Sequence, residues 1–200
     1  MVNQFDREAY LRERLNGFLA EGLCLPPDDY YSNLKAEHFL SLKSVLGDIN
    51  NIFTLKVTHA FTDWITSALN LSSSVKEDIT QSVLNTKPST NGYDIEISEP
   101  IKIIAEVKCN IPINGGSVYG SAQKNGIQKD INALMCGKSK SSINPEQYLK
   151  FMVFLDLPEI RKATEHFIKN LKKYKEDISF IDDSSNVYTP DKIYVVFVSI

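Results

Sequence analysis

The chain has 200 residues, of which 42% are hydrophobic and 24% are charged, and its net charge is −3 at neutral pH. This length and composition are typical of one globular domain, and the low Gly and Pro content excludes a linker or a collagen-like chain. Every uncharged apolar stretch is far shorter than the roughly 18 residues of a membrane span, and the first residues lack an apolar signal region. We therefore expect a cytoplasmic protein without a membrane anchor. Its widely spaced cysteines indicate reduced thiols: Cys24, Cys109 and Cys136.

The charge is unevenly distributed along the chain. Residues 1–100 carry 8 Lys and Arg against 14 Asp and Glu, whereas residues 101–200 carry 14 against 11. The window 102–175 is the most basic, with 13 against 6. We expect a basic face on the second half, with lysines that only solvate helix surfaces as the alternative. The acidic first half suits a dimer interface or the binding of a partner protein.

The first 85 residues are predicted to be mainly helical. Apolar residues recur there at helical spacing, and a serine run followed by Glu77 is typical of a helix start. Pro26 and Pro27 end the first helical segment. The predicted helices cover residues 5–22, 33–47, 51–69 and 75–84.

After a loop over 86–92, the pattern changes to strands that alternate with helices. Period-two alternation over 93–98 and the apolar run 101–109 predict a β-hairpin with its turn near Pro100. A Gly-rich connector follows over 110–120. The remaining elements are a helix over 121–137, a strand over 151–157, a helix over 159–175 and a strand over 192–200. This order predicts an α/β fold with a central mixed sheet flanked by helices. We expect a single domain, 1–200, with a mainly helical region (1–85) and a hairpin and sheet core (86–200).

The hairpin carries the most informative polar residues. Glu106 and Lys108 are two residues apart on one predicted strand, so their side chains point to the same face. With the turn centred at Pro100, Asp94 on the preceding strand lies opposite Glu106. Two carboxylates and one ammonium group should therefore converge on one patch. The alternative is a solvated edge hairpin with a Glu–Lys cross-strand pair.

Such a group of side chains matches the needs of phosphodiester hydrolysis with Mg²⁺. This ion takes oxygen ligands, which Asp94, Glu106 and the backbone carbonyl of Val107 would supply. A bound Mg²⁺, or Mn²⁺ as a substitute, polarises the phosphate and lowers the pKa of a bound water. Lys108 would orient that water and stabilise the charge that develops in the transition state.

The string Gly92-Tyr93-Asp94, followed after eleven residues by Glu106-Val107-Lys108, resembles the PD-(D/E)xK nuclease superfamily. The resemblance covers this hairpin and the element order of about residues 50–200. It implies the restriction-endonuclease-like fold, with metal-dependent catalysis by Asp94, Glu106 and Lys108. Tyr93 replaces the Pro of the motif. The Glu that some members carry on the preceding helix is missing or displaced, because the helix over 51–69 has only Asp63.

The resemblance also implies contacts between the next helix and the DNA backbone. The candidates on that helix are Gln123, Lys124, Gln128 and Lys129. Lys138 and Lys140 follow it in a Lys- and Ser-rich loop and are candidates for phosphate contacts. In the Gly-rich connector, Tyr119 is a candidate for stacking on a base, with a plain connector as the alternative.

The sequence thus predicts a Mg²⁺-dependent endonuclease acting on double-stranded DNA, either a type II restriction enzyme or a related repair or defence nuclease. One site per chain and two strands to cut imply a homodimer. The chain has four arginines, three of them in the first helix, which argues against a stand-alone reader of guanine. The alternative is a non-catalytic DNA- or protein-binding module that keeps the fold. The complete set of Asp94, Glu106 and Lys108 favours the enzyme.

Overall fold

The computed structural model describes residues 5–85, 92–113, 116–181 and 187–200. The predicted loop over 86–92 lies outside the described residues except for Gly92, and the connector over 110–120 is described except for 114–115. The chain divides into two compact units, Met1–Ile49 and Asn50–Ile200, and one long helix contributes residues to both.

The unit Met1–Ile49 is helical and has almost no core. Its elements are α1 (Arg7–Gly17), the π-helical segment η1 (Phe18–Gly22), α2 (Tyr30–Asn33) and the first part of α3 (Ala36–Ala68). Asp6 begins α1 by accepting a hydrogen bond from the backbone N–H of Glu8 at 2.9 Å. Among the described residues of this unit, only Leu19 is buried. The predicted helix over 5–22 is confirmed by α1 and η1.

The predicted helices over 33–47 and 51–69 form one continuous helix, α3. The residues between them, 48–50, include no proline and no glycine. They carry no signal strong enough to end a helix. In α3, all the buried residues lie at Val57 and beyond.

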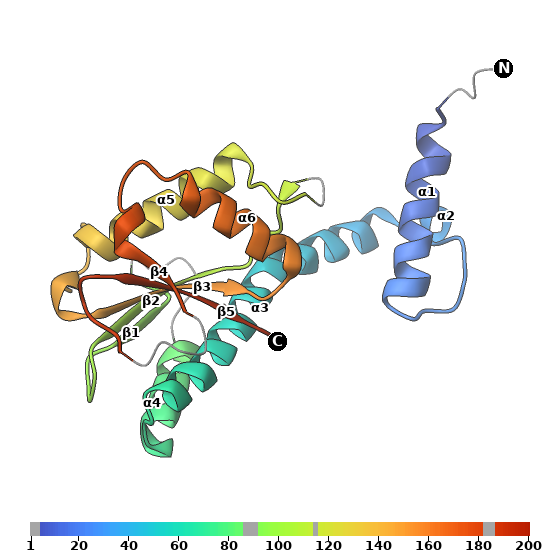
Figure 1. Cartoon of the computed structure of the whole chain (residues 1–200). Helices are drawn as coiled ribbons and strands as arrows, with labels where there is room; N and C mark the ends of the chain where they lie inside the picture. Colours follow the sequence, from blue (N-terminus) through green and yellow to red (C-terminus); the bar gives the residue numbers. More distant parts are fainter. Residues whose placement is uncertain (1–4, 86–91, 114–115, 182–186) are drawn as a thin grey trace. The chain divides into compact units, whose positions relative to one another are not determined.

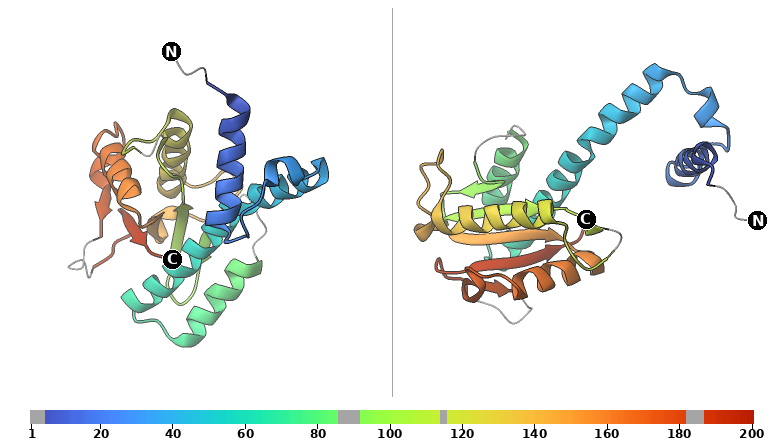
Figure 2. Two further views of the ribbon diagram at one scale, coloured as in Figure 1. Left: turned by 90° about the vertical axis from the view of Figure 1, so that its right-hand side faces the viewer. Right: turned by 90° about the horizontal axis from the view of Figure 1, so that it is seen from above.

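The unit Asn50–Ile200 contains a five-stranded mixed sheet with helices on both faces (Figures 1 and 2). The strand order is β1-β2-β3-β5-β4, in which β1 pairs antiparallel with β2 and the other neighbours pair in parallel. The prediction of a mixed sheet flanked by helices is confirmed. β4 is an addition, because three residues are too few to show a period in the sequence. The strands are β1 (Ile95–Ile97), β2 (Ile103–Lys108), β3 (Leu149–Leu155), β4 (Ile178–Phe180) and β5 (Ile193–Val198).

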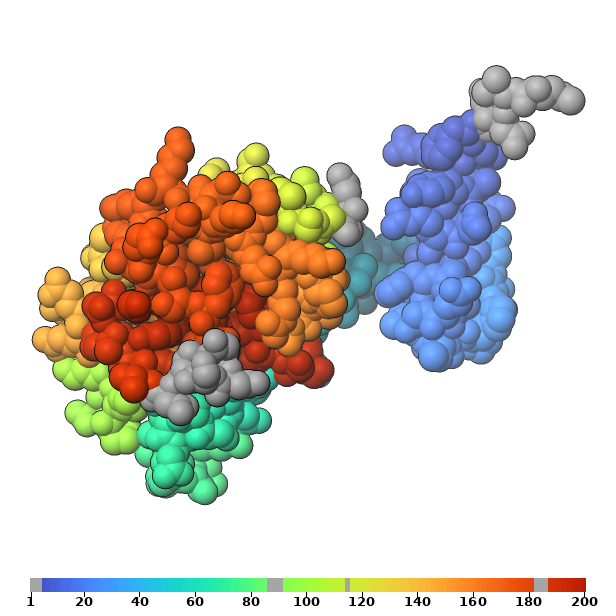
Figure 3. All heavy atoms as spheres, in the orientation of Figure 1, coloured from blue at the N-terminus to red at the C-terminus, as the bar shows by residue number. Residues whose placement is uncertain are grey.

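Helices cover this sheet because its central strands are apolar on both faces. α5 packs against β2, β3 and β5, while on the other face Phe61 of α3 contacts Phe151 of β3, with ring centres 5.4 Å apart. In Figure 3, α6 and the segment after it form much of the visible surface of this unit. α6 ends at Lys169, earlier than the predicted residue 175. The remaining elements are α4 (Ser73–Asn85), α5 (Ser121–Cys136), α6 (Pro158–Lys169), η3 (Pro145–Gln147) and η4 (Lys175–Asp177).

The structure also bears on the state of the cysteines and on membrane-spanning helices. All three cysteines are free, as predicted. None of the helices in the described ranges combines the length and the apolar character needed to cross a bilayer.

Candidate active site

The register of the hairpin brings Asp94 opposite Glu106. Ile95 of β1 pairs with Ala105 of β2, and Ile97 pairs with Ile103, so the hairpin is centred at residue 100 as predicted. One step beyond the last pair, Asp94 faces Glu106. Lys108 ends β2 two residues later.

Two carboxylates replace the next backbone pair of this ladder. The Val107 N–H donates to Asp94 Oδ2 at 2.7 Å, and the Tyr93 N–H donates to Glu96 Oε1 at 2.9 Å. In a continued antiparallel ladder, Tyr93 and Val107 would instead exchange both of their backbone hydrogen bonds. The Asp94 and Glu96 carboxylates thus accept the two N–H groups that the next pair of the ladder would have donated to backbone carbonyls.

Glu106 is a buried carboxylate paired with a lysine from outside the hairpin. Its exposed fraction is 3%, and Lys138 Nζ lies 2.5 Å from Glu106 Oε1. The same ammonium donates to the Gly92 carbonyl at 2.5 Å and lies 4.7 Å from the centre of the Tyr93 ring. Burial and the nearby Asp94 carboxylate raise the pKa of Glu106 to about 7, although Lys138 acts in the opposite direction.

Lys108 forms a second ion pair, with a residue that the sequence analysis did not single out. Its Nζ lies 2.6 Å from Asp130 Oδ2 on α5. Burial lowers the pKa of Lys108, but the carboxylates of Asp130, Asp94 and Glu106 outweigh it, so the pKa is raised and the ammonium stays charged. A signal for Asp130 exists in the sequence, since it lies between Ile127 and Ile131, both of which are buried on α5. A carboxylate at the margin of a buried helix face needs a partner.

The donor set fits a magnesium ion. Within the described ranges, no group of three or more His, Cys, Asp or Glu side chains is arranged to hold a metal. Mg²⁺ does not require such a group, because proteins bind it through one or two carboxylates together with water and phosphate oxygens. Asp94, Glu106 and the Val107 carbonyl are all hard oxygen donors. In the described part of the chain, Glu106 Oε1 is buried without a regular hydrogen bond and keeps only its ion pair with Lys138.

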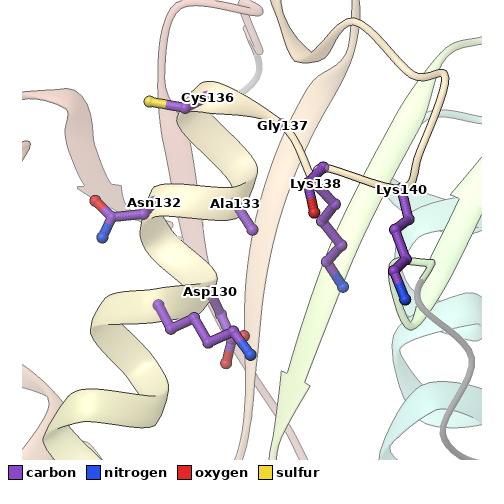
Figure 4. Close-up of a pocket in the computed structure, with 9 residues that line it drawn as sticks. Asp130, Asn132, Ala133, Cys136, Gly137, Lys138 and Lys140 are labelled. Atoms are coloured by element: carbon purple, nitrogen blue, oxygen red, sulfur yellow. The ribbon is translucent and has the colours of Figure 1, made fainter.

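Three of the predicted DNA-binding lysines line a single open pocket of about 410 Å³ at the end of α5. They are Lys129, Lys138 and Lys140, and Asp130 lies beside them. Figure 4 shows Lys138 and Lys140 extending in the same direction after the end of α5, while Asn132 and Cys136 point to the other side of the helix. Lys129 and Lys140 are exposed to solvent. The structure therefore groups these lysines next to the carboxylate site.

The other predicted DNA contacts lie elsewhere. Gln123 is used within the chain, because its Oε1 accepts from the Gly120 N–H at 2.9 Å and its Nε2 donates to the Ile111 carbonyl at 2.7 Å. Lys124 and Gln128 are half-buried on α5 and do not line the pocket. The sequence pattern does not rank these residues, and only the fold separates them from Lys129.

Tyr119 requires a correction. Its side chain is 1% exposed, so the prediction that it stacks on a base is wrong for this structure. The Tyr119 hydroxyl lies 2.8 Å from Thr164 Oγ1 on α6, and its ring contacts Phe167 edge to face. Because its one polar atom is satisfied inside the protein, the ring is retained in the core.

Comparison of the chain with protein-family models, with curated proteins and with solved structures found no match.

Proposed function

We propose that this chain is a Mg²⁺-dependent endonuclease that hydrolyses DNA phosphodiester bonds in the cytoplasm, as a type II restriction enzyme or a related repair or defence nuclease. Its fold would be the restriction-endonuclease-like variant of the mixed α/β sheet. The observation that carries the proposal is the hairpin end, where Asp94 faces Glu106 and Lys108 follows on the same strand. The lysine-lined pocket at the end of α5 supports it, because polyanions bind to clustered cations.

Each group in the site has a distinct task. Asp94, Glu106 and the Val107 carbonyl would hold the metal, which when bound supplies Lewis-acid activation of the phosphate and of a water molecule. Asp130 fixes the Lys108 ammonium at 2.6 Å and keeps it protonated. Lys108 thus acts as a cation that orients water and stabilises the charge on the phosphate oxygens. The three lysines that line the pocket, Lys129, Lys138 and Lys140, would bind phosphates of the DNA backbone without reading sequence.

We also propose that the enzyme works as a homodimer, because one site per chain must serve two strands. The helical unit supports this proposal, since large apolar side chains such as Leu40 and Val45 are 67% and 60% exposed there. Sedimentation equilibrium of the full chain should give twice the monomer mass. A monomer at concentrations that cut both strands would contradict the proposal.

The function is tested by a cleavage assay on supercoiled plasmid and phage DNA with Mg²⁺, with Mn²⁺ and with EDTA. Lys108→Met should lower the cleavage rate by at least about a hundredfold, because it removes transition-state charge stabilisation. The matched control is Lys102→Met, whose ammonium bonds Gln147 at 2.7 Å and lies outside the site. Its rate should equal that of the wild type.

The products also distinguish the candidate activities. Discrete fragments that require metal and Lys108 indicate a restriction enzyme, whereas a metal-dependent smear indicates a nuclease without strong sequence preference. Equal rates for the wild type and Lys108→Met would contradict the mechanism. A folded protein that binds DNA and cuts no substrate would instead favour a non-catalytic module.

A further inference from the structure

Lys138 contributes a cation to the carboxylate site from outside the hairpin. It follows α5 after Gly137, whose φ of +90° favours glycine and redirects the chain at the end of the helix. From there its Nζ reaches Glu106 Oε1 and the Gly92 carbonyl, each at 2.5 Å, and lies over the Tyr93 ring. A carboxylate oxygen, a carbonyl oxygen and an aromatic face together make a site suited to a cation.

The contact with Glu106 uses the same oxygen donor that the proposed metal site needs. Two cations on one carboxylate oxygen repel each other strongly in a buried environment. Lys138 and a divalent cation should therefore compete for Glu106. Lys108 does not fill this role, because it ends a strand inside the sheet and is already paired with Asp130.

We propose that Lys138 is the internal counter-ion of the metal site and exchanges Glu106 for a DNA phosphate when a divalent cation binds. This inference rests on the proposed function. The place to which Lys138 moves is the pocket that it lines together with Lys129 and Lys140. Its side chain leaves a non-helical segment on a long flexible stem, so the ammonium moves without disturbing the sheet.

The exchange couples metal binding to DNA binding. A bound metal releases Lys138 for a phosphate, and a bound phosphate draws Lys138 away from Glu106. Each ligand should therefore tighten the binding of the other by the same factor. Without Lys138, the metal site has no internal competitor, and this part of the coupling disappears.

The first test titrates Mg²⁺ into the metal-free full chain, without DNA, by calorimetry at pH 8. Lys138→Met should bind Mg²⁺ about tenfold more tightly than the wild type, within the usual range of such couplings. The matched control is Lys140→Met, because Lys140 lines the same pocket and is exposed. Its metal affinity should stay within about twofold of the wild type. Equal or weaker binding by Lys138→Met would overturn the inference.

A measurement on the unaltered chain covers the case in which Lys138→Met does not fold. The protein is labelled with an amine-acylating reagent, with and without Mg²⁺, and the modified lysines are quantified by mass spectrometry. Mg²⁺ should increase the labelling of Lys138 severalfold and leave that of Lys140 unchanged. Protection of Lys138 that does not respond to Mg²⁺ would show a fixed structural ion pair and overturn the inference.

The second test measures DNA binding by fluorescence anisotropy in the Lys108→Met background, in which cleavage is suppressed. At constant ionic strength, Mg²⁺ should strengthen DNA binding about tenfold in this background and less than about twofold after Lys138→Met is added. Adding Lys140→Met instead should leave the enhancement in place. An enhancement that survives the loss of Lys138 would contradict the exchange.

These outcomes separate the inference from the proposed function. Metal-dependent cleavage with equal Mg²⁺ affinity in the wild type and Lys138→Met overturns only the inference. Tighter Mg²⁺ binding by Lys138→Met in a protein that cuts no DNA supports the counter-ion role and overturns the nuclease. Absence of Mg²⁺ binding in both proteins overturns both.

Discussion

The units Met1–Ile49 and Asn50–Ile200 both contain helices with regularly spaced apolar residues, but these residues are mostly exposed in the first unit and mostly buried in the second. α3 illustrates this within one helix, since Phe39 and Leu46 are exposed near its start whereas Phe61 and Ile65 are fully buried further along. Both stretches are equally helical. Apolar periodicity thus indicates which face of a helix can be buried, and the presence of a sheet to pack against decides whether it is.

Exposed ion pairs occur in both units, but among the described residues only the second unit also has ion pairs that are shielded from water. In the described part of Met1–Ile49, ion pairs lie in solvent, as between Glu8 and Arg12, whose side chains are 63% and 43% exposed. In Asn50–Ile200, Glu106 and Lys108 are shielded from water and each is paired with a residue of α5 or of the turn after it. Exposed ion pairs contribute little to stability, whereas loss of one partner of a buried ion pair is strongly destabilising because it leaves an unpaired charge. Chemistry is therefore expected in the second unit.

The largest expected effect is on the free energy of unfolding, and it is measured by truncating two phenylalanines of α3. Phe61→Ala should lower the free energy of unfolding by about 3–5 kcal/mol, because it opens a cavity against the sheet. Phe39→Ala, the same change at a residue that is 39% exposed, should cost less than about 1 kcal/mol. Urea unfolding of both variants provides the measurement. A cost at Phe39 as large as that at Phe61 would show that a second copy covers this helix, and the contrast would then hold only for the single chain.

The next largest effect is on the cleavage rate, which should depend on the carboxylates of the site and not on a glutamate of the helical unit. Glu106→Gln and Asp94→Asn should each lower metal-dependent cleavage by at least about a hundredfold, because both remove a proposed metal ligand. Glu8→Gln changes an exposed glutamate of the helical unit and should leave the rate unchanged. Plasmid cleavage gives the rates, and circular dichroism confirms that the variants fold. Cutting at the wild-type rate by either site variant would remove that carboxylate from the mechanism.

Much of the site could be predicted because the signals for it are local. Period-two alternation fixed the face of Glu106 and Lys108, and a turn at Pro100 fixed the register that places Asp94. For Asp130, the local signal indicates only that its carboxylate needs a partner, and the identity of that partner depends on how α5 packs on β2. The same is true of the Glu106–Lys138 pair, whose members lie 32 positions apart in the chain.

For the fold too, local sequence patterns predict only part of the structure. The order of the main strands and helices follows from local patterns, whereas β4 and the continuity of α3 do not. The sequence predicts that Tyr119 can stack on a base, but partners on α6, Thr164 and the Ile160 carbonyl, keep its hydroxyl in the core. Burial of a polar group depends on a distant partner, and such partners are not visible in a single sequence.

The smallest expected effect is on pH dependence, and it has opposite signs in the two units. Burial, with Asp94 nearby, raises the pKa of Glu106 from 4.5 to about 7, so the folded chain binds a proton more tightly than the unfolded chain. Its contribution to stability is present below pH 4.5 and is lost as the pH rises to about 7. For the half-buried Asp29, hydrogen bonds from Ser32 and Asn16 lower the pKa below 3.8, so its contribution is present above that pH and is lost in acid.

Urea unfolding of the metal-free protein between pH 4.5 and pH 7 measures this effect. The free energy of unfolding of the wild type should fall by roughly 2 kcal/mol relative to that of Glu106→Gln over this range. Parallel pH profiles of the two proteins would mean that Glu106 is ionised throughout, as a tightly held partner of Lys138.

Both edges of the sheet are formed by strands of only three residues, β1 and β4. On β1, the ladder is also interrupted at its open end by the carboxylates of Asp94 and Glu96. Edge strands this short give a neighbouring chain few backbone groups to pair with, which disfavours strand-to-strand aggregation. An ordered assembly of this protein would therefore use side chains on helices, and its partner choice could evolve without altering the sheet that carries the proposed catalytic groups.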